Sequence, residues 1–457
     1  MAKIGLEIHG YLQTKEKLFC RCKAARHSKK QEIKPNTNIC PICTGQPGCK
    51  PMLPNAEAIK KLIQIALLLD CEPNTFEKGK KLVWQRKHYD WPDLPKGYQE
   101  TISGPYSVPV GEKGRFEDIG IREVHLEEDP AAWNPESGCI DYNRSGLPLV
   151  EIVTEPDFKT EEEVELWLKK LILTLSYIKA VDKNAGLKAD VNVSTSGERV
   201  EIKNMTSIES IKSAIKYEIE RQAKEQVLRE TRRFDEKTGK TVLMRTKEQA
   251  EDYRFIPDPD LPIIKLSEKE ILELKKKLPE TPMQKLKKLV SKFKLNKEEA
   301  EVLTKNLEIV EFYEKVSEKI DPRFSLSWVT IELLRVLNWN KKTLDQVDIN
   351  PEHFIELLEQ VKAGKITESK AKQIINSFVP KSFSVKSKLK EFETISDKGE
   401  IEEICKKVIK QNEKAVNDYK LGEAKALNFL IGEVMKASKR KADFQTSKKA
   451  LEKFLKG

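Results

Sequence analysis

The stretch LPLVEIVTEPD, residues 147–157, combines the pattern of a buried strand with a residue that is out of place there. Its aliphatic and β-branched residues form a short apolar run that ends before a proline, which is typical of a strand covered on both faces. Glu151 lies inside this run, between Val150 and Ile152. A carboxylate without a partner in such a place is costly or takes up a proton, so we expect a cation beside Glu151.

A second strand-like stretch, KIGLEIHG at residues 3–10, carries a similar anomaly. Successive side chains of a strand point to opposite faces. The alternation therefore places the aliphatic residues on one face and both Glu7 and His9 on the other. Two residue types that commonly bind metals are thus expected to point the same way.

A third stretch, REVHLEEDP at residues 122–130, pairs His125 with Glu127 on one face and leaves Glu128 on the other. Acids and imidazoles that recur in three strands suit a hard divalent cation such as Mg²⁺, which commonly binds together with nucleotide phosphates. The alternation does not decide whether Glu127 or Glu128 is the ligand. The plainer alternative for each residue is a salt-bridged glutamate at a sheet edge or a structural histidine.

Clustered cysteines indicate a second kind of metal site. Five of the eight cysteines fall within residues 18–49, namely Cys20, Cys22, Cys40, Cys43 and Cys49. The first four form C-x-C and C-x2-C pairs, a pattern that favours a closed structural zinc site. Cys49 or His27 is an alternative ligand, and a set of buried thiols without metal is the alternative to zinc. A zinc ion here would fasten the loop and so have a folding role.

The segment QRKHYDWPDLPKGYQ, residues 85–99, places Arg86, Lys87 and Lys96 among aromatic residues and prolines. Basic groups on a rigid turn beside a carboxylate–metal site are suited to holding nucleotide phosphates. The sequence has neither a G-x4-G-K-[ST] motif nor the glycine-rich loop and H-R-D motif of protein kinases. ATP is therefore expected to bind by another route.

Length and charge divide the chain. Its 457 residues predict two to four domains, and the absence of a signal pattern or a long apolar run predicts a cytoplasmic protein without membrane spans. Residues 1–262 carry 42 Lys and Arg against 42 Asp and Glu, whereas residues 263–457 carry 41 against 31. A neutral body followed by a basic appendage suits a polyanionic ligand; a solvated lysine-rich surface is the alternative.

Strand-like and helical stretches are interleaved up to about residue 262, and amphipathic helices follow. We therefore expect an α+β catalytic body with a mixed or antiparallel sheet, then an all-α helical domain, then a small helical tail domain. The expected boundaries are residues 1–280 for the body, which includes the cysteine loop, 281–392 for the helical domain and 393–457 for the tail.

A series of motifs extends over most of the chain. In order, they are IGLEIHGYLQTKEKLFCRC, NTNICPICTGQPG, DLPKGYQ, HLEEDPA, DYNRSGLPLVEIVTEPD, DVNVS, VEIKNM, DYRFIPDPDLP and LGEAKALNFLIGEVMKASK. This series resembles the GatB subunits of the tRNA-dependent amidotransferase GatCAB, and the last motif resembles their YqeY-type tail. One departure is RKHYDWPD, where the family more often has RKNYFYPD.

The resemblance implies a ligase that is active within a complex. GatB subunits use ATP and Mg²⁺ to phosphorylate the side-chain carboxylate of Glu on tRNA(Gln) or of Asp on tRNA(Asn). Ammonia, which the GatA subunit releases from glutamine, then displaces the phosphate. The implied partners are therefore GatA, GatC and the misacylated tRNA. Phosphorylation makes the carboxylate oxygen a good leaving group, and metal-held phosphates support that step.

The resemblance also implies roles for particular residues. The implied Mg²⁺ ligands are His9, Glu128 and Glu151, with Glu7 nearby as a further catalytic residue. Contacts to nucleotide, substrate or a second metal are implied for Lys87, Asp190 and Glu201. The zinc ligands are implied to be Cys20, Cys22, Cys40 and Cys43, in a structural rather than a chemical role.

The resemblance gives the basic rear half a purpose, namely tRNA binding through phosphates and shape. The expected contacts are Lys420, Lys425, Lys436, Lys439, Arg440 and Lys441. One alternative is a GatE-type subunit specific for Glu-tRNA(Gln), which the lack of room for GatE's large insertion disfavours. The other is a non-catalytic, zinc-bearing tRNA-binding protein.

Overall fold

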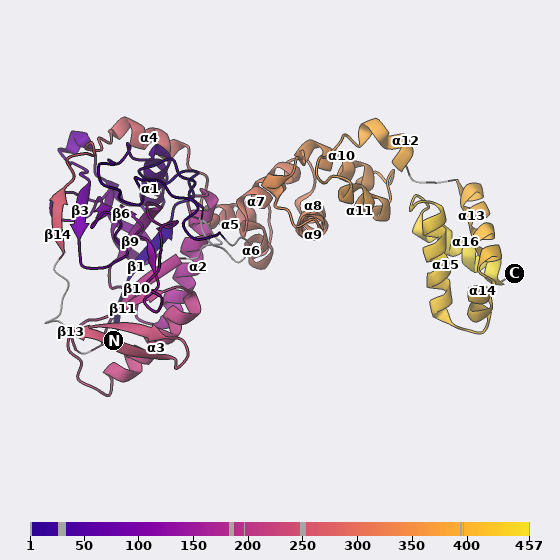
Figure 1. The fold of residues 1–457 in the computed structure, drawn as a ribbon. Helices are drawn as coiled ribbons and strands as arrows, with labels where there is room; N and C mark the ends of the chain where they lie inside the picture. The colour runs from indigo at the N-terminus through magenta and orange to yellow at the C-terminus, as the bar shows by residue number, and fades with distance from the viewer. Residues whose placement is uncertain are drawn as a thin grey trace. The chain divides into compact units, whose positions relative to one another are not determined.

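A computed structural model describes residues 2–25, 33–181, 187–195, 197–246, 253–393, 395 and 397–456 of the chain. The chain divides into two compact units, Met1–Thr281 and Pro282–Gly457 (Figure 1). The first contains a sheet with helices, and the second is helical. This confirms the expected fold class, whereas the residue boundaries given above for the three domains stay predictions.

The first unit is built on one large sheet, which has twelve strands within the described residues. The order along its main path is β13-β12-β11-β10-β1-β9-β6-β4-β3-β14, and β5 pairs with both β2 and β6. All of these pairs are antiparallel except β11 with β12. The strands are β1 Lys3–Tyr11, β2 Glu72–Pro73, β3 Gln85–His88, β4 Gln99–Thr101, β5 Gly111–Phe116, β6 Ile119–Glu128, β9 Pro148–Thr154, β10 Leu187–Ser194, β11 Val200–Met205, β12 Glu230–Asp235, β13 Lys240–Thr246 and β14 Arg254–Pro257. A separate hairpin pairs β7 Ala132–Trp133 with β8 Ile140–Asp141.

One face of the sheet is apolar and covered by helices. The alternation expected in β1 holds, because Ile4, Leu6 and Ile8 are buried in the main core while Glu7 and His9 are only partly buried. Core residues of this face pack against side chains from several helices. The helices are α1 Ala56–Leu68, α2 Glu161–Tyr177, α3 Ile208–Gln222 and α4 Glu268–Lys276. The polar residues of the central strands therefore lie on the opposite face of the sheet.

The cysteine loop is fastened to the segment that leads into β9. The side-chain oxygen of Asn143 accepts hydrogen bonds from the backbone amides of Thr37 and Asn38, each at 2.9 Å. The Ser145 hydroxyl donates to the carbonyl of Cys43 at 2.6 Å. The position of the loop and the start of the strand that carries Glu151 are therefore linked through residues 143–146.

The second unit contains two groups of helices. The first consists of α5 Pro282–Ser291, α6 Lys297–Thr304, α7 Leu307–Ser317, α8 Pro322–Ser327, a π-helical turn Trp328–Leu333, α9 Leu334–Trp339, α10 Pro351–Lys362, α11 Glu368–Asn376 and α12 Leu389–Phe392. The second consists of α13 Lys398–Gln411, α14 Glu413–Lys420, α15 Ala424–Ala437 and α16 Phe444–Lys456. The second group has its own apolar core, which includes Cys405, Leu430 and Leu451. Within the described residues, no helix has the length and hydropathy needed to cross a bilayer.

Two glycines of the cysteine loop provide a matched test of how tightly the loop packs. Gly45 and Gly48 both have positive φ angles, of 65° and 85°. A Cβ at Gly45 would overlap the Pro95 carbonyl group, whereas a Cβ at Gly48 would meet nothing within 4 Å. Both substitutions by alanine introduce left-handed strain, but only the first also forces backbone atoms apart.

We therefore expect Gly45→Ala to lower the free energy of unfolding by about 1–3 kcal/mol more than Gly48→Ala does, the usual range for overpacking. Urea denaturation of the two variants measures this difference. Equal losses in the two variants would show that the loop does not press against Pro95.

Candidate active site

Strand register brings three of the polar residues into one row across the sheet. Glu151 on β9 pairs with His9 on β1 on one side and with His125 on β6 on the other. The Glu151 Oε2 atom lies 3.3 Å from His9 Nε2 and 3.2 Å from His125 Nε2. In the structure, two imidazole rings therefore take the place of the cation expected beside Glu151.

Glu127 forms a group of potential metal ligands with His9 and Glu151. One ligand atom each from His9, Glu127 and Glu151 lies within 4.8 Å of the others. Glu127 is buried, with its carboxylate 3.9 Å from Lys87 Nζ and accepting a hydrogen bond from Gln99 at 3.2 Å.

Glu128 does not join that group. The ligand set of His9, Glu128 and Glu151 stays a prediction, whereas the ligand atoms that lie together in the structure are those of His9, Glu127 and Glu151. The Glu128 carboxylate lies 2.6 Å from Lys96 Nζ and accepts a hydrogen bond from the Glu100 amide at 3.4 Å. The physical reason is the two-residue period of β6, which sends neighbouring side chains to opposite faces.

The charges in the row reinforce one another. Burial opposes protonation of His9, but the Glu151 carboxylate outweighs it and raises the pKa of His9 to about 9. The pKa of His125 is likewise raised well above its usual value, chiefly by Glu151 against the effect of burial. Burial alone would raise the pKa of Glu151, but His125 and His9 hold it well below its usual range. Glu151 is therefore an anion between two cationic rings.

A second acidic group lies beside the first. Ligand atoms of Glu7, Asp190 and Glu201 also fall within 4.8 Å of one another. Glu7 pairs with Asp190 across β1 and β10. Lys203 Nζ contacts two of the carboxylates, at 3.0 Å from Asp190 and 2.7 Å from Glu201. Burial and the nearby Glu151 raise the pKa of Glu7.

A cavity of about 260 Å³ opens over this polar face. It is lined by Glu7, Lys87, Thr101, Ser103, Arg122, Glu123, His125, Glu127, Glu151, Val153 and Phe255. The Lys87 ammonium lies 4.7 Å from the centre of the Tyr253 ring. Burial disfavours the charge of Lys87, but Glu127 outweighs it and raises the pKa of the amine. The cavity therefore combines several carboxylates with a lysine that stays charged at neutral pH.

The other basic residues of the 85–99 segment are engaged elsewhere. Arg86 Nε donates to Asp258 at 2.7 Å, and Lys96 is paired with Glu128. Burial, together with a hydrogen bond to Asp258, raises the pKa of Glu100 to about 10, so this carboxyl is protonated at neutral pH. Of the three basic residues expected to hold phosphates, only Lys87 lines the cavity.

The sequence indicated some of these residues and missed others. Alternation placed His125 and Glu127 on one face, but His125 was not among the expected site residues. Arg122 and Lys203 carry no signal in the sequence, because a lysine or arginine in a strand is usually a solvated residue. Strand pairing alone brings Lys203 to the acids on β10 and β11.

The four expected zinc ligands come together. The Sγ atoms of Cys20, Cys22, Cys40 and Cys43 lie within 4.8 Å of one another, and those of Cys40 and Cys43 are 3.8 Å apart. A tetrahedral zinc site with Zn–S bonds of about 2.3 Å has S–S edges of about 3.8 Å, so this donor set fits zinc. Cys49 is exposed and outside the group, and His27 lies outside the described residues. The hydrogen bond between Cys20 and Cys43 lowers the pKa of Cys43 to about 5.

Comparisons with known proteins identify the family of the chain. A family model described as the GatB/GatE catalytic domain matches residues 2–272, and one described as the GatB domain matches residues 311–455. The chain therefore belongs to the GatB/GatE family, which confirms the resemblance found in the sequence, and with it to the amidotransferases, which are ligases.

Individual relatives match over nearly the full length. The chain is 42% identical to a protein of Methanococcus maripaludis over 100% of its length and 98% of the relative's. It is 43% identical to a protein of Methanothermobacter thermautotrophicus over 96% and 97%, and 41% identical to one of Methanopyrus kandleri over 98% and 97%. Each of these relatives is named as the B-subunit of aspartyl/glutamyl-tRNA(Asn/Gln) amidotransferase.

The two neighbouring glutamates of β6 allow a direct test of the metal group. We expect Glu127→Gln to weaken Mn²⁺ binding by about 10-fold or more, because it removes one of the few anionic ligands of a hard cation. Glu128→Gln is the matched control and should change the affinity by less than about 3-fold, since its carboxylate lies beside Lys96. Electron paramagnetic resonance titration of free Mn²⁺ gives both affinities. A larger loss in Glu128→Gln than in Glu127→Gln would contradict the assignment.

Proposed function

We propose that the chain is the GatB subunit of an Asp/Glu-tRNA(Asn/Gln) amidotransferase and that the cavity over the central strands is its phosphorylation site. The observation that carries this proposal is the group of His9, Glu127 and Glu151 in a GatB-family body, two of whose members, Glu127 and Glu151, line one cavity together with Lys87. Near full-length relatives that are named as the B-subunit favour this over a GatE-type subunit.

The proposed chemistry has two steps. A side-chain carboxylate oxygen of Glu or Asp on the misacylated tRNA attacks the γ-phosphorus of ATP, which gives an acyl phosphate and ADP. Ammonia then attacks the acyl carbon, and inorganic phosphate leaves with that oxygen, so that an amide remains. A divalent ion bound in this site would supply neutralisation of phosphate charge. The chain needs no covalent nucleophile of its own.

Residues in and beside the cavity have distinct parts in this proposal. His9, Glu127 and Glu151 would hold the ion. His9 would release its ring proton on binding, since only a neutral imidazole binds a metal, and one imidazole with two carboxylates is then a fitting donor set. Lys87 remains cationic in its buried position and is placed to neutralise a phosphoryl oxygen. The group of Glu7, Asp190 and Glu201 would hold a second ion or contact the nucleotide. In the structure, the ammonium of Lys203 compensates the negative charge of Asp190 and Glu201, so an incoming ion would have to displace it.

The proposed reaction needs further subunits, because the chain does not supply the ammonia itself. Its sequence contains no glycine- and serine-rich amidase tract, so a GatA subunit is the expected source of ammonia, with GatC as the third subunit. Zinc in the cysteine group would fasten the loop against the body and take no part in the chemistry. We expect the complex to act in the cytoplasm.

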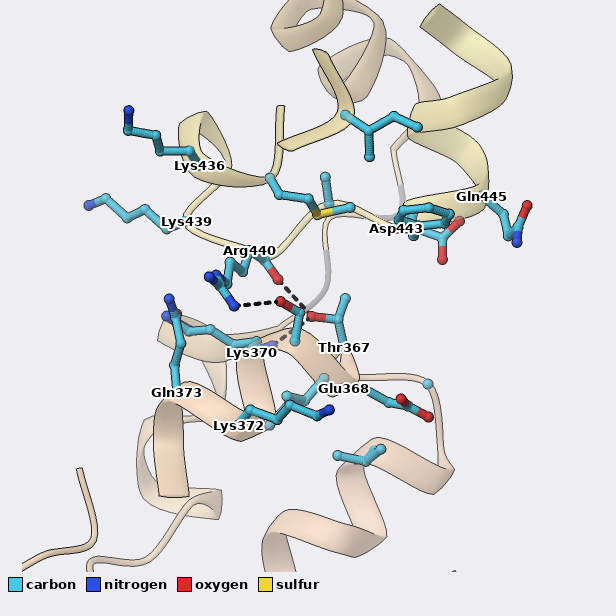
Figure 2. Close-up of a pocket in the computed structure, with 18 of the residues that line it drawn as sticks. Thr367, Glu368, Lys370, Lys372, Gln373, Lys436, Lys439, Arg440, Asp443 and Gln445 are labelled. Carbon is cyan, nitrogen blue, oxygen red and sulfur yellow. Dashed lines mark hydrogen bonds between the residues drawn. The ribbon is translucent and has the colours of Figure 1, made fainter. Parts of the chain in front are cut away.

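A basic cleft in the second unit supports a role in tRNA binding. It has a volume of about 1680 Å³, and its basic lining residues are Lys362, Lys370, Lys372, Lys436, Lys439 and Arg440. Figure 2 shows Lys436, Lys439 and Arg440 on one side and Lys370 and Lys372 on the other. The carbonyl of Arg440 accepts a hydrogen bond from the Thr367 hydroxyl at 2.6 Å, and its guanidinium donates to Ser369 at 3.2 Å.

Repulsion among the lysines in and beside this cleft favours the binding of an anion there. Burial lowers the pKa of Lys370, and the neighbouring charges of Lys441 and Lys439 lower it further. A phosphate group between them would relieve that repulsion. The other three expected contacts, Lys420, Lys425 and Lys441, do not line the cleft. Lys420 and Lys425 are exposed, at the end of α14 and the start of α15.

The function is tested in a complex of this chain with candidate GatA and GatC subunits. We expect ATP- and glutamine-dependent amidation of Glu-tRNA(Gln), of Asp-tRNA(Asn) or of both, assayed separately. Glu151→Gln should lower kcat by about 100-fold or more while leaving tRNA affinity unchanged, because it removes charge from the reacting site alone. Glu165→Gln, on the surface of α2, is the control. Failure of the unaltered complex on both tRNAs would rule out the proposal, and an active Glu151→Gln complex would leave a non-catalytic binding role.

The cleft is tested by its dependence on salt. We expect Lys436→Ala with Lys439→Ala to weaken tRNA binding and to reduce the slope of log affinity against log salt concentration by about 2, since each phosphate contact contributes about 0.9. The kcat at saturating tRNA should not change. Lys453→Ala, an exposed lysine on α16 paired with Glu402, is the matched control. Equal effects in the control and the double variant would contradict a specific role for the cleft.

A further inference from the structure

Lys17 is a buried lysine whose environment is unusual. Its side chain is 1% exposed, and it stands among the largest fully buried side chains of the described residues. Its ammonium nitrogen lies 3.5 Å from Cys43 Sγ and 3.2 Å from the carbonyl oxygen of Tyr142. Within the part of the chain that the structure describes, no carboxylate forms an ion pair with it.

A buried ammonium group requires negative charge nearby. Removing it from water costs several kcal/mol even after relaxation, and a single carbonyl dipole does not compensate for that cost. Among the described residues, the side-chain atom at hydrogen-bonding distance from it is the sulfur of Cys43, which belongs to the cysteine group. Lys17 therefore indicates that the cysteine group is anionic when the protein is folded.

The charge of a tetrathiolate zinc site matches this requirement. Four thiolates and one Zn²⁺ ion carry a net charge of −2, and burying that charge without a counter-ion is unfavourable. Cys20 and Cys43 are buried, so water cannot compensate for the charge on that side of the site. An ammonium group against Cys43 reduces the net charge to −1 and donates a charge-assisted hydrogen bond to the sulfur.

We propose that Lys17 is a positioning residue of the zinc centre, which acts as its buried counter-ion and orients Cys43 through an N–H···S hydrogen bond. Residues that contact metal ligands in this way commonly change metal affinity by about 10–100-fold when they are removed. Lys17 neither binds the ion nor takes part in the phosphorylation chemistry. Its role goes beyond the proposed function but rests on the zinc centre that is part of it.

Backbone hydrogen bonds connect the segment around Lys17 to the sheet, so that a change at Lys17 would also affect the sheet. The Lys17 amide donates to the carbonyl of Cys22 at 3.0 Å, and the Leu18 amide donates to the carbonyl of Gly146 at 2.7 Å. A Cβ at Gly146 would lie 3.5 Å from Lys17 Cδ and 3.6 Å from Cys43 Cβ. Lys17 thus lies between the cysteine group and the segment that enters β9.

The first experiment measures zinc in the purified full-length chain and its release to a coloured chelator. Lys17→Met keeps the length and the apolar stem of the side chain but removes its charge. We expect this variant to release zinc at least about 10-fold faster than the unaltered chain. Lys17→Arg should restore much of the difference, because it keeps the charge. Lys15→Met, at an exposed lysine two residues away, is the matched control and should release zinc at the unaltered rate.

The second experiment separates an electrostatic role from general destabilisation. In the cobalt-substituted protein, absorption of light transfers charge from sulfur to the metal. A cation beside Cys43 stabilises the sulfur electrons, so its removal in Lys17→Met should shift this band to lower energy, while Lys15→Met leaves it in place. If Lys17 served only packing, Lys17→Met would unfold more easily but the band would not move.

The outcomes are distinct. Faster zinc release with a shifted cobalt band supports the proposal. Unchanged release, or an unshifted band, in a zinc-loaded Lys17→Met protein overturns the role of Lys17 and leaves the proposed function intact. Absence of zinc from the unaltered chain, including after refolding with zinc, overturns the centre itself, while the amidation assay still decides the function.

Discussion

The carboxylate of Glu151, held between the imidazoles of His9 and His125, is the interaction on which the polar site of the first unit depends. It places charged groups in the middle of a sheet whose other face is the main core. Such an arrangement is stable only if the three strands keep one register, since a shift by one residue would turn the acids into the core. The apolar face, packed against the helices, holds that register.

Sequence patterns predicted the parts of this site that depend on local geometry. Strand periodicity is local, so the shared face of Glu7 and His9, and that of His125 and Glu127, followed from the residues alone. Which strands are neighbours is not local, and neither is the partner of a given lysine. The resemblance assigned a ligand role to Glu128, whereas strand geometry pairs it with Lys96. Lys203 could not be predicted as a site residue, because only the pairing of β10 with β11 brings it to the acids.

The first unit contains groups of potential metal ligands that differ in ligand type. The carboxylate and imidazole groups over the sheet suit a hard ion that exchanges with nucleotide, whereas the four sulfurs suit an ion that stays. The two sites are joined through residues 142–146, which contact the cysteine loop and then continue into β9. An ion held by the four sulfurs would therefore support the geometry of the proposed reaction without taking part in it. The second unit adds a basic cleft suited to phosphate.

The central claim is that this body activates a carboxylate by phosphorylation. The most direct measurement uses misacylated tRNA whose Glu or Asp side-chain carboxylate is labelled with ¹⁸O, followed by mass analysis of the inorganic phosphate released during amidation by the complex. The account predicts that each phosphate carries one ¹⁸O atom from the side chain, because that oxygen bridges carbon and phosphorus before ammonia displaces it. Phosphate without label, released alongside amidated tRNA, would contradict it.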